Sequence, residues 1–342
     1  MDNKELGEMK KNDLRLNAKK MQYYKKMIYC IFLLVTFCFY CTPAFCTQPT
    51  IGLALGMGGE RFFIHIGVLK VLEEEGIKVD YLSGTSSGAF VAGLYALWED
   101  IQRIEILSLN IEFKKYYKYL NEIAGFKKVD DTSFLMFYIE VNEKKFNPKW
   151  LKGLVDTRII RDEIDLLTNR ASFEYDLKIP FAAIAVNLEN GEKVVIDHGR
   201  ISNAIAASMA RPGTCIPFQY QGMMLVDGAL VDPLPIDVLK EMGADIVIGV
   251  DLSGIRKDRS PVANNVLSIV SQSIDIMLES LSKAKSSHAD IVIKPEYSGV
   301  FNGIIDSKER LYLMSLGEKE ARKIIPALKE RIATYSMSNE FQ

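Results

Sequence analysis

From Thr50 onward, short apolar runs alternate with segments of helical periodicity, and this alternation constrains the fold more than any other feature. Continuous apolar runs are typical of strands buried in a parallel sheet, and intervening helices then cover both faces of that sheet. The pattern therefore predicts one α/β domain, residues 49–335, with a mostly parallel central sheet flanked by helices. Residues 336–342 are expected to be a C-terminal tail.

The predicted strands are Ile51–Leu55, Val79–Leu82, Phe181–Val186, Val194–Ile196, Met224–Val226, Asp245–Val250 and Asp290–Ile293. The predicted helices are His65–Glu75, a helix ending near Trp98, Asn203–Met209, Ile236–Met242, a helix within Val262–Lys285 and Glu318–Ile332.

Composition narrows the class of protein. A chain of 342 residues with 48% hydrophobic and 25% charged residues can bury a substantial core. The net charge of −2 gives no reason to expect a nucleic-acid partner. Cys215 is the only cysteine after residue 46, which excludes an internal disulfide framework in the domain. No Cys/His spacing predicts a zinc site and no acidic loop predicts a calcium site, so neither metal nor cofactor is expected.

The first 48 residues are predicted to be a basic leader with a signal peptide or membrane anchor. Lys25 and Lys26 precede an almost uninterrupted apolar run, Met27–Phe45. A basic segment before an apolar core is typical of a secretory signal peptide, and Ala44-Phe45-Cys46 is a loose match to a cleavage site. The run is also nearly long enough to span a bilayer, with the lysines cytoplasmic; a buried helix is the third interpretation. We expect export or membrane association, and favour cleavage over anchoring.

The sharpest chemical signal is Gly84-Thr85-Ser86-Ser87-Gly88, a G-x-S-x-G between a predicted strand and a predicted helix. A serine on a tight strand-to-helix turn is held exposed, and flanking glycines tolerate crowding there. The N-terminus of the following helix stabilises negative charge. Ser86 is therefore a candidate nucleophile, although five-residue matches also arise by chance.

A second glycine-rich turn, Gly56-Met57-Gly58-Gly59-Glu60-Arg61, also joins a strand to a helix. Successive N–H groups of such a turn can surround an oxyanion. A dinucleotide fingerprint with Asp80 as the ribose acid is a weak rival, because Arg61 occupies the third glycine position. A P-loop is excluded by the missing Gly-Lys-Ser/Thr. A tight turn without function is the remaining alternative, and Arg61 either orients the turn, meets a lipid phosphate or forms a surface ion pair.

A serine nucleophile needs a nearby base. Asp227 directly follows the strand-like run Met223–Val226, and Gly228 comes next. The chain has three histidines, at His65, His198 and His288. A Ser86–Asp227–His288 triad has the chain order of α/β-hydrolases, but their oxyanion loop normally lies further before the nucleophile. Spacing alone leaves the identity of the base open.

The least regular stretch is expected at Ile101–Trp150, where lysines are interleaved with aromatic residues. The clusters are Phe113–Leu120, Phe126–Lys128 and Phe134–Glu140. Such a surface suits a lipid headgroup layer, and equally suits a solvated helix with a packed aromatic side.

From about Thr50 to Ile332 the sequence resembles bacterial patatin-like phospholipases. The resemblance rests on GLALGMGGERFFIHIGVLKVLEE, GTSSG, SMARPGTCIPF and LVDGALVDPLPIDVLKEMGADIVIGVDL, which occur in the family's order. It implies a single three-layer patatin-like domain that hydrolyses acyl esters of phospholipids, lysophospholipids or related lipids, without a cofactor, at a membrane surface. It also implies a Ser–Asp dyad without histidine, with Ser86 as nucleophile, Asp227 as base, and Gly58 and Gly59 as oxyanion-hole donors.

The glycine turn departs from the family pattern, in which Met57 and Phe62 would both be glycine. If the backbone at Phe62 needs a positive φ, strain of about 1 kcal/mol is expected there. Ala229 is a variant that the family commonly has. Two alternatives stay open: a catalytically silent member that binds lipid or a protein, and an esterase or acyltransferase for non-phospholipid esters.

Overall fold

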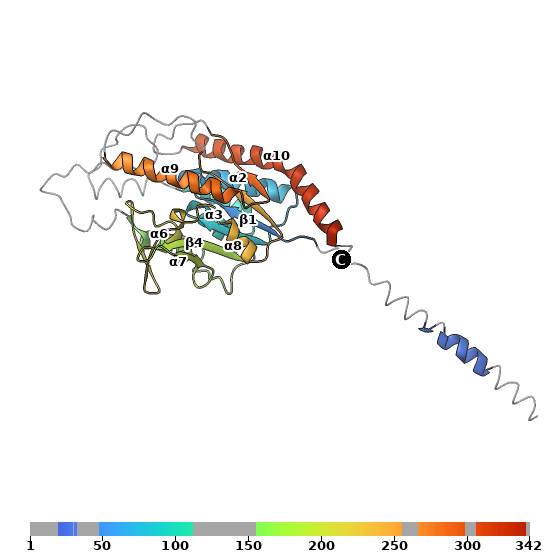
Figure 1. Ribbon diagram of the computed structural model, residues 1–342. Helices are drawn as coiled ribbons and strands as arrows, with labels where there is room; N and C mark the ends of the chain where they lie inside the picture. The colour runs from blue at the N-terminus through green and yellow to red at the C-terminus, as the bar shows by residue number, and fades with distance from the viewer. Residues whose placement is uncertain are drawn as a thin grey trace, which may run out of the picture. The chain divides into compact units, whose positions relative to one another are not determined.

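The computed structural model describes residues 20–29, 31–32, 48–111, 155–254, 266–297 and 306–339. The chain divides into two units, Gln48–Tyr335 and a terminal unit made of Met1–Thr47 with Ser336–Gln342. Gln48–Tyr335 contains the sheet and all the residues discussed as a candidate site (Figure 1).

The main unit is built on an eight-stranded sheet with the order β10-β9-β1-β2-β4-β8-β7, in which β5 also pairs with β4. The pairs from β10 to β4 are parallel, whereas β5, β7 and β8 pair antiparallel. The strands of this sheet are β1 (Ile51–Leu55), β2 (Tyr81–Thr85), β4 (Phe181–Asn187), β5 (Lys193–Ile196), β7 (Phe218–Tyr220), β8 (Met223–Asp227), β9 (Ile246–Val250) and β10 (Ile291–Ile293). A separate parallel pair consists of β3 (Val155–Asp156) and β6 (Cys215–Ile216).

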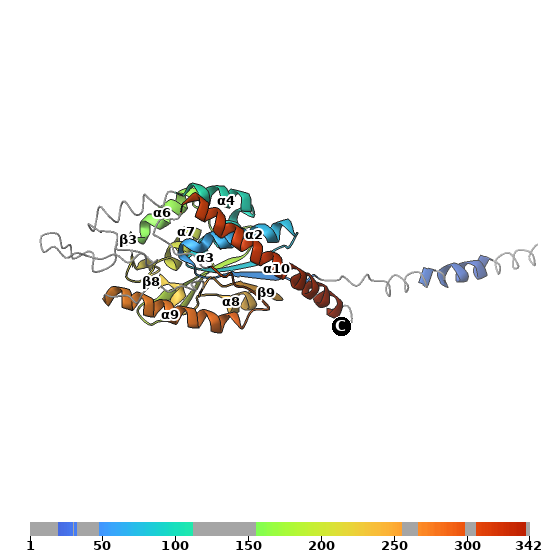
Figure 2. The ribbon, with the colours of Figure 1, turned by 90° about the horizontal axis from the view of Figure 1, so that it is seen from above.

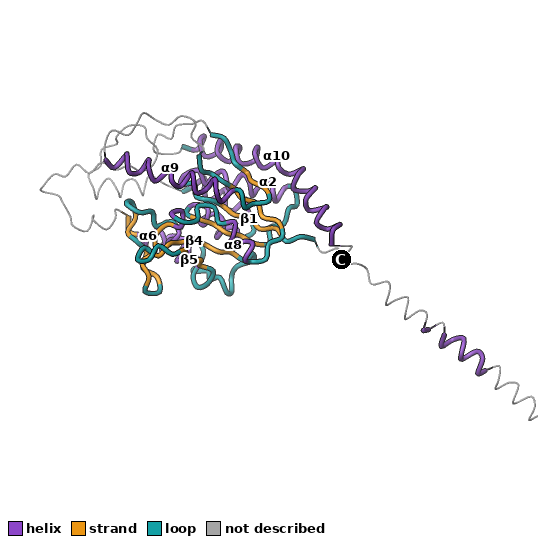
Figure 3. Tube along the Cα trace, viewed as in Figure 1, coloured by secondary structure: helices purple, strands orange, loops and turns teal. Residues whose placement is uncertain are grey.

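Helices cover both faces of the sheet, so the unit has three layers (Figures 2 and 3). On one face lie α2, α3, α4, α6, α7 and α10; on the other lie α8 and α9. The α-helices are α2 (Phe63–Glu74), α3 (Ser87–Trp98), α4 (Ile101–Asn110), α6 (Thr157–Leu167), α7 (Ile201–Ser208), α8 (Ile236–Glu241), α9 (Val266–Ser286) and α10 (Ser307–Asn339). Two 3₁₀ turns are η1 (Gly59–Phe62) and η3 (Gly228–Leu230). The expected α/β class with a central sheet between helices is confirmed.

Alternate residues of β1 and β9 pack into two different cores, one on each face of the sheet. In β1, Leu53 and Leu55 pack into the large core beneath α2 and α3, whereas Ala54 packs against α8 on the other face. In β9, Ile246, Ile248 and Val250 join the large core and Val247 the smaller one. Because successive strand side chains point to opposite faces, strands buried on both sides must be apolar throughout. This requirement explains why they were recognisable as continuous apolar runs.

Several predicted elements differ in their bounds from the observed ones. The second strand is Tyr81–Thr85 rather than Val79–Leu82. Its polar residues Ser83 and Thr85 can lie inside the protein, because their hydroxyls donate hydrogen bonds to the carbonyls of Pro235 and Asp232. The stretch expected to be least regular begins with the regular helix α4, whose N-terminus is capped by the carboxylate of Asp100. The last helix is longer than Glu318–Ile332 and contains Pro326.

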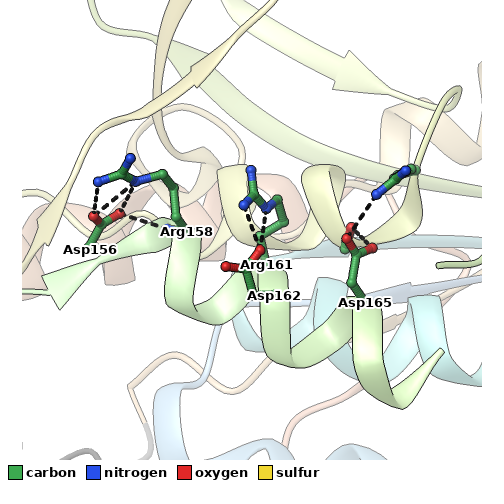
Figure 4. A network of polar contacts seen from close by, with 7 residues as sticks. Asp156, Arg158, Arg161, Asp162 and Asp165 are labelled. Atoms are coloured by element: carbon green, nitrogen blue, oxygen red, sulfur yellow. Dashed lines mark hydrogen bonds and ion pairs between the residues drawn. The ribbon is translucent and has the colours of Figure 1, made fainter. Parts of the chain in front are cut away.

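A polar network connects α6 to α7 (Figure 4). Asp156 caps the N-terminus of α6 and pairs with the guanidinium of Arg158. At the other end of α6, the buried Asp165 accepts hydrogen bonds from Ser202 Oγ at 2.6 Å and Arg200 Nη1 at 3.1 Å. The start of α7 is thereby held against α6, and α7 ends at Ser208, which contacts the candidate site.

In the terminal unit, residues 20–29, 31 and 32 are helical. No helix within the described residues is long and apolar enough to cross a bilayer. Most of the apolar run Met27–Phe45, and the clusters Phe113–Leu120, Phe126–Lys128 and Phe134–Glu140, lie outside the described residues. The leader, its role in export or membrane association, and the lipid-facing surface therefore stay predictions, as do the domain boundaries.

Candidate active site

The register of the sheet brings Ser86 and Asp227 together. Ser86 follows β2, whose last residue Thr85 pairs with Ile184 of β4. Asp227 ends β8 and pairs with Ala185, the next residue along β4. Two segments far apart in the sequence therefore end at neighbouring positions of one strand. The Oγ of Ser86 donates a hydrogen bond to Oδ2 of Asp227 at 2.7 Å.

The backbone of Ser86 is strained. Its φ is 56° and its ψ is −125°, a combination that an L-residue rarely adopts. The N–H of Ser86 donates to Ser208 Oγ at 2.8 Å, which helps to hold this conformation. The neighbouring Gly88 is needed for space, because a Cβ there would lie 2.1 Å from the carbonyl oxygen of Leu55. The turn thus presents a partly exposed serine at the N-terminus of α3.

The carboxyl group of Asp227 is buried, with 6% of the residue exposed. Its Oδ1 accepts the N–H of Ala229 at 2.9 Å, while Oδ2 accepts the hydroxyl of Ser86. Burial raises the pKa of Asp227 to about 6, although these hydrogen bonds and the nearby Arg211 favour the ionised form. The group is therefore ionised at neutral pH, and it is a stronger base than an ordinary aspartate.

Gly58 and Gly59 lie in the turn between β1 and α2. The turn starts beside the serine, because Leu55 at the end of β1 pairs with Gly84 of β2. Gly59 has a φ of 55°, which glycine adopts without the penalty of a Cβ. Arg61 Nε donates to the carbonyl of Gly58 at 3.0 Å, so this arginine orients the turn. Within the described part of the chain, the N–H groups of Gly58 and Gly59 donate to no protein acceptor.

The strain considered at Phe62 does not arise. Phe62 has a φ of −56°, and the positive φ falls on Gly59 instead. Phe62 is 5% exposed, and its ring stacks on that of Phe63 with the ring centroids 4.2 Å apart. Met57 is accommodated in the turn, with its N–H donating to the carbonyl of Pro233 at 2.9 Å. Both departures from the family pattern therefore fit the fold without a positive φ at either residue.

No histidine within the described residues hydrogen-bonds to Ser86 or Asp227. His288 Nδ1 lies 2.7 Å from Asp237 Oδ1, and His198 contacts Asp197 and Gln221. His65 is fully buried and contacts the carbonyl of Gly56. The alternative Ser86–Asp227–His288 triad gains no support from these contacts. Among the described residues, no group of three or more His, Cys, Asp and Glu side chains is placed to hold a metal ion.

Two contacts of the site were not identified from the sequence. Ser208 reaches the N–H of Ser86 although the residues are 122 positions apart. The segment after Asp227 supports both loops: the carbonyl of Asp232 accepts the hydroxyl of Thr85 at 2.8 Å, and that of Pro233 accepts the N–H of Met57. Ser208 lies in the segment SMARPGTCIPF, which carried the family resemblance, but its partner cannot be read from local spacing.

The family model of patatin-like phospholipases matches residues 53–240, which contain Ser86, Asp227 and the glycine turn. The chain belongs to the patatin-like phospholipase family. Its patatin-like region is also 28% identical, over 236 residues, to an uncharacterised NTE family protein of Mycobacterium bovis, covering 69% of this chain and 58% of the relative. It is 31% identical over 214 residues to a Candida glabrata protein named Lysophospholipase NTE1, covering 62% of this chain and 11% of that protein.

The chain thus spans little more than half of the mycobacterial relative and about a tenth of the fungal one. Among solved structures, VipD from Legionella pneumophila is similar with a TM-score of 0.43 and 13% identity, over 82% of this chain and 67% of that chain. The expected membership of the patatin-like family is confirmed by the family model.

Proposed function

We propose that this patatin-like protein is a serine lipid acyl hydrolase in which Ser86 is the nucleophile and Asp227 the base. The observation that carries the proposal is the 2.7 Å hydrogen bond from Ser86 Oγ to the buried carboxylate of Asp227. A hydroxyl group becomes an effective nucleophile when a base within hydrogen-bonding distance removes its proton. The serine is also held on a strained turn at a helix N-terminus, a context typical of nucleophilic serines.

Asp227 takes the proton of Ser86 as Oγ attacks the carbonyl carbon of the ester. A pKa of about 6, raised by burial, suits this step because the base is mostly ionised at pH 7 and still binds a proton well. When the tetrahedral intermediate collapses, Asp227 gives the proton to the departing alcohol. Water, deprotonated by Asp227, then hydrolyses the acyl ester of Ser86.

The N–H groups of Gly58 and Gly59 are proposed to stabilise the oxyanion. Neither donates to a protein group within the described residues, and Gly58 lies beside Ser87, the residue after the nucleophile. Preorganised donors of this kind typically contribute two to three orders of magnitude to the rate, about 3–4 kcal/mol. Arg61 holds the carbonyl of Gly58, which supports the orientation of the turn.

Phospholipids or lysophospholipids at a membrane surface are the proposed substrates. This choice rests on membership of the patatin-like family and on the name Lysophospholipase carried by the fungal relative. The assay is fatty acid release by the purified chain from lysophosphatidylcholine and phosphatidylcholine micelles. Ser86→Ala and Asp227→Asn test the dyad. Ser273→Ala, which removes an exposed hydroxyl on α9, serves as a matched control.

We expect release by the wild type and the control, and loss of at least a thousandfold in both dyad variants. Activity that survives Ser86→Ala would overturn the hydrolase assignment. Preference for short soluble esters, without increase above the critical micelle concentration, would replace lipid by small esters as substrate. A folded wild type inert on every ester would support a silent lipid- or protein-binding member of the family.

A further inference from the structure

His65 is a buried titratable residue that the dyad mechanism does not use. It lies in the first turns of α2, is 0% exposed, and its Nε2 lies 2.8 Å from the carbonyl oxygen of Gly56. A carbonyl oxygen only accepts, so Nε2 carries the hydrogen and donates it. Burial lowers the pKa of His65 to about 4, so the imidazole is neutral at physiological pH. Its Nδ1 is a buried acceptor without a partner among the described residues.

Gly56 is where the glycine turn leaves β1. Its N–H donates to the carbonyl of Val250 at 3.1 Å, and the next N–H, that of Met57, donates to Pro233. Its carbonyl oxygen packs against α3, since a Cβ on Gly88 would lie 2.6 Å from it. The peptide between Gly56 and Met57 is therefore held by the His65 donor on its carbonyl and by the Pro233 acceptor on its N–H. The next residues along the chain are Gly58 and Gly59.

We propose that His65 is a positioning residue that holds the Gly56 carbonyl and thereby aims the N–H groups of Gly58 and Gly59 at the reacting oxygen. The inference rests on the proposed function, because it assigns His65 a part in that same oxyanion site. The hydrogen bond from His65 to Gly56 links the first residue of the turn to the helix that follows the turn, and so fixes the two ends of the turn relative to each other. A buried carbonyl without a hydrogen-bond donor costs free energy, so loss of the His65 donor would favour rotation of this peptide. That rotation would redirect the N–H groups of Gly58 and Gly59, which follow it in the chain.

The unpartnered Nδ1 supports a role beyond packing. A buried polar atom without a hydrogen bond lowers stability, so Nδ1 gives no reason for a histidine at position 65. The feature that the site uses is the N–H donor at the position of Nε2. A side chain with an amide N–H of similar reach should therefore preserve the function better than an apolar side chain of similar volume.

The test compares His65→Gln, which keeps an N–H donor, with His65→Leu, which removes it. Leu69→Ala is the matched control, because Leu69 is a fully buried core residue of the same helix, about one helical turn further along the chain from the glycine turn than His65. All variants are assayed below their melting temperatures for kcat and KM on one ester. The affinity for an alkyl trifluoromethyl ketone, whose hemiketal oxyanion mimics the tetrahedral intermediate, is measured in parallel.

We expect His65→Leu to lower kcat by about 10- to 100-fold while KM changes less than about threefold. The affinity for the ketone should fall by the same factor as kcat. His65→Gln should recover kcat to within about fivefold of the wild type, and Leu69→Ala should retain kcat despite lower stability. Equal kcat in His65→Leu and the wild type, or equal losses in His65→Leu and Leu69→Ala, overturns the positioning role while leaving the hydrolase proposal intact. A wild type without esterase activity overturns both.

Discussion

The hydroxyl of Ser86 donates directly to the carboxylate of Asp227 across 2.7 Å, and no histidine of the described residues lies in hydrogen-bond contact with either group. In the proposed mechanism, the carboxylate of Asp227 accepts the proton that catalysis removes from Ser86. Burial favours this transfer, because it raises the pKa of Asp227 to about 6. The arrangement has consequences for pH dependence, stability and the tolerance of the site to substitution.

The first prediction concerns the pH profile of kcat/KM. The base is active only when ionised, so kcat/KM should fall about tenfold per pH unit below pH 6 and level off above it. The measurement is initial rates on a soluble ester between pH 4.5 and 8, in buffers of constant ionic strength. A profile that stays flat down to pH 4.5 would show that no group with the pKa expected for Asp227 controls the reaction.

The second prediction concerns stability. The pKa of Asp227 is raised from 3.8 to about 6, so ionisation of the folded protein is unfavourable relative to the unfolded chain. The group contributes full stability below pH 4, and this contribution is lost as the pH rises through 6. Asp227→Asn should therefore raise the free energy of unfolding at pH 7 by about 1–3 kcal/mol relative to wild type. Urea melts at pH 4 and pH 7 measure this: the gain should be smaller at pH 4, and equal gains would contradict it.

The third prediction follows from the backbone strain at Ser86. A φ of 56° with ψ of −125° costs an L-residue about 1–3 kcal/mol, whereas glycine adopts it freely. Ser86→Gly and Ser86→Ala should both be inactive, but Ser86→Gly should be the more stable by about 1 kcal/mol. This difference is net of the greater unfolded-state entropy of glycine. Thermal unfolding of the two variants is the measurement, and a more stable alanine variant would argue against strain at this turn.

The sequence predicted the parallel core of the fold well, because strands buried on both faces must be apolar throughout. β1 was predicted with its observed bounds, Ile51–Leu55, and β9 differs by one residue. The second strand was displaced because Ser83 and Thr85 look like turn residues until the carbonyls of Pro235 and Asp232 are placed beside them. The N-cap Asp100 was a local signal for α4 that went unused.

In the candidate site, too, the features that depend on local sequence were predicted and those that depend on tertiary packing were not. Ser86 and the glycine turn were predicted as candidates from motifs at strand ends, whereas the roles of Asp227, Gly58 and Gly59 were implied by the family resemblance and stay proposals. The contacts of Ser208 and His65 were not foreseen. Ser208 meets Ser86 only after the sheet has formed, and the contact of His65 with Gly56 depends on how α2 packs against the turn.

The fourth prediction tests the support that Ser208 gives to the turn. Ser208→Ala removes the acceptor of the Ser86 N–H and leaves a backbone donor unsatisfied in a part-buried position. The free energy of unfolding should fall by about 1–3 kcal/mol, and kcat should fall about tenfold as the serine loses its orientation. Ser208→Thr, which keeps a hydroxyl, is the control and should lose less of both. Equal kcat in Ser208→Ala and wild type would show that this bond does not orient the nucleophile.

The fifth prediction concerns the close approach of α3 to the glycine turn. A Cβ on Gly88 would lie 2.1 Å from the backbone oxygen of Leu55 and 2.6 Å from that of Gly56. Gly88→Ala should therefore lower the free energy of unfolding by about 3 kcal/mol or more, since backbone must move. Gly191→Ala, at a φ of 75° with no atom within 4 Å of its Cβ, should lose only about 1 kcal/mol. Comparable losses in the two variants would contradict the close packing.

The acyl-enzyme on Ser86 is the most direct test of the proposed dyad. The purified chain is mixed rapidly with a p-nitrophenyl ester of a medium-chain fatty acid, quenched in acid and digested for peptide mass spectrometry. The dyad predicts a peptide containing Ser86 heavier by one acyl group, at wild-type levels in Ser273→Ala, strongly reduced in Asp227→Asn and absent in Ser86→Ala. An acyl group on another residue, or ester hydrolysis that proceeds undiminished in Ser86→Ala, would contradict the account.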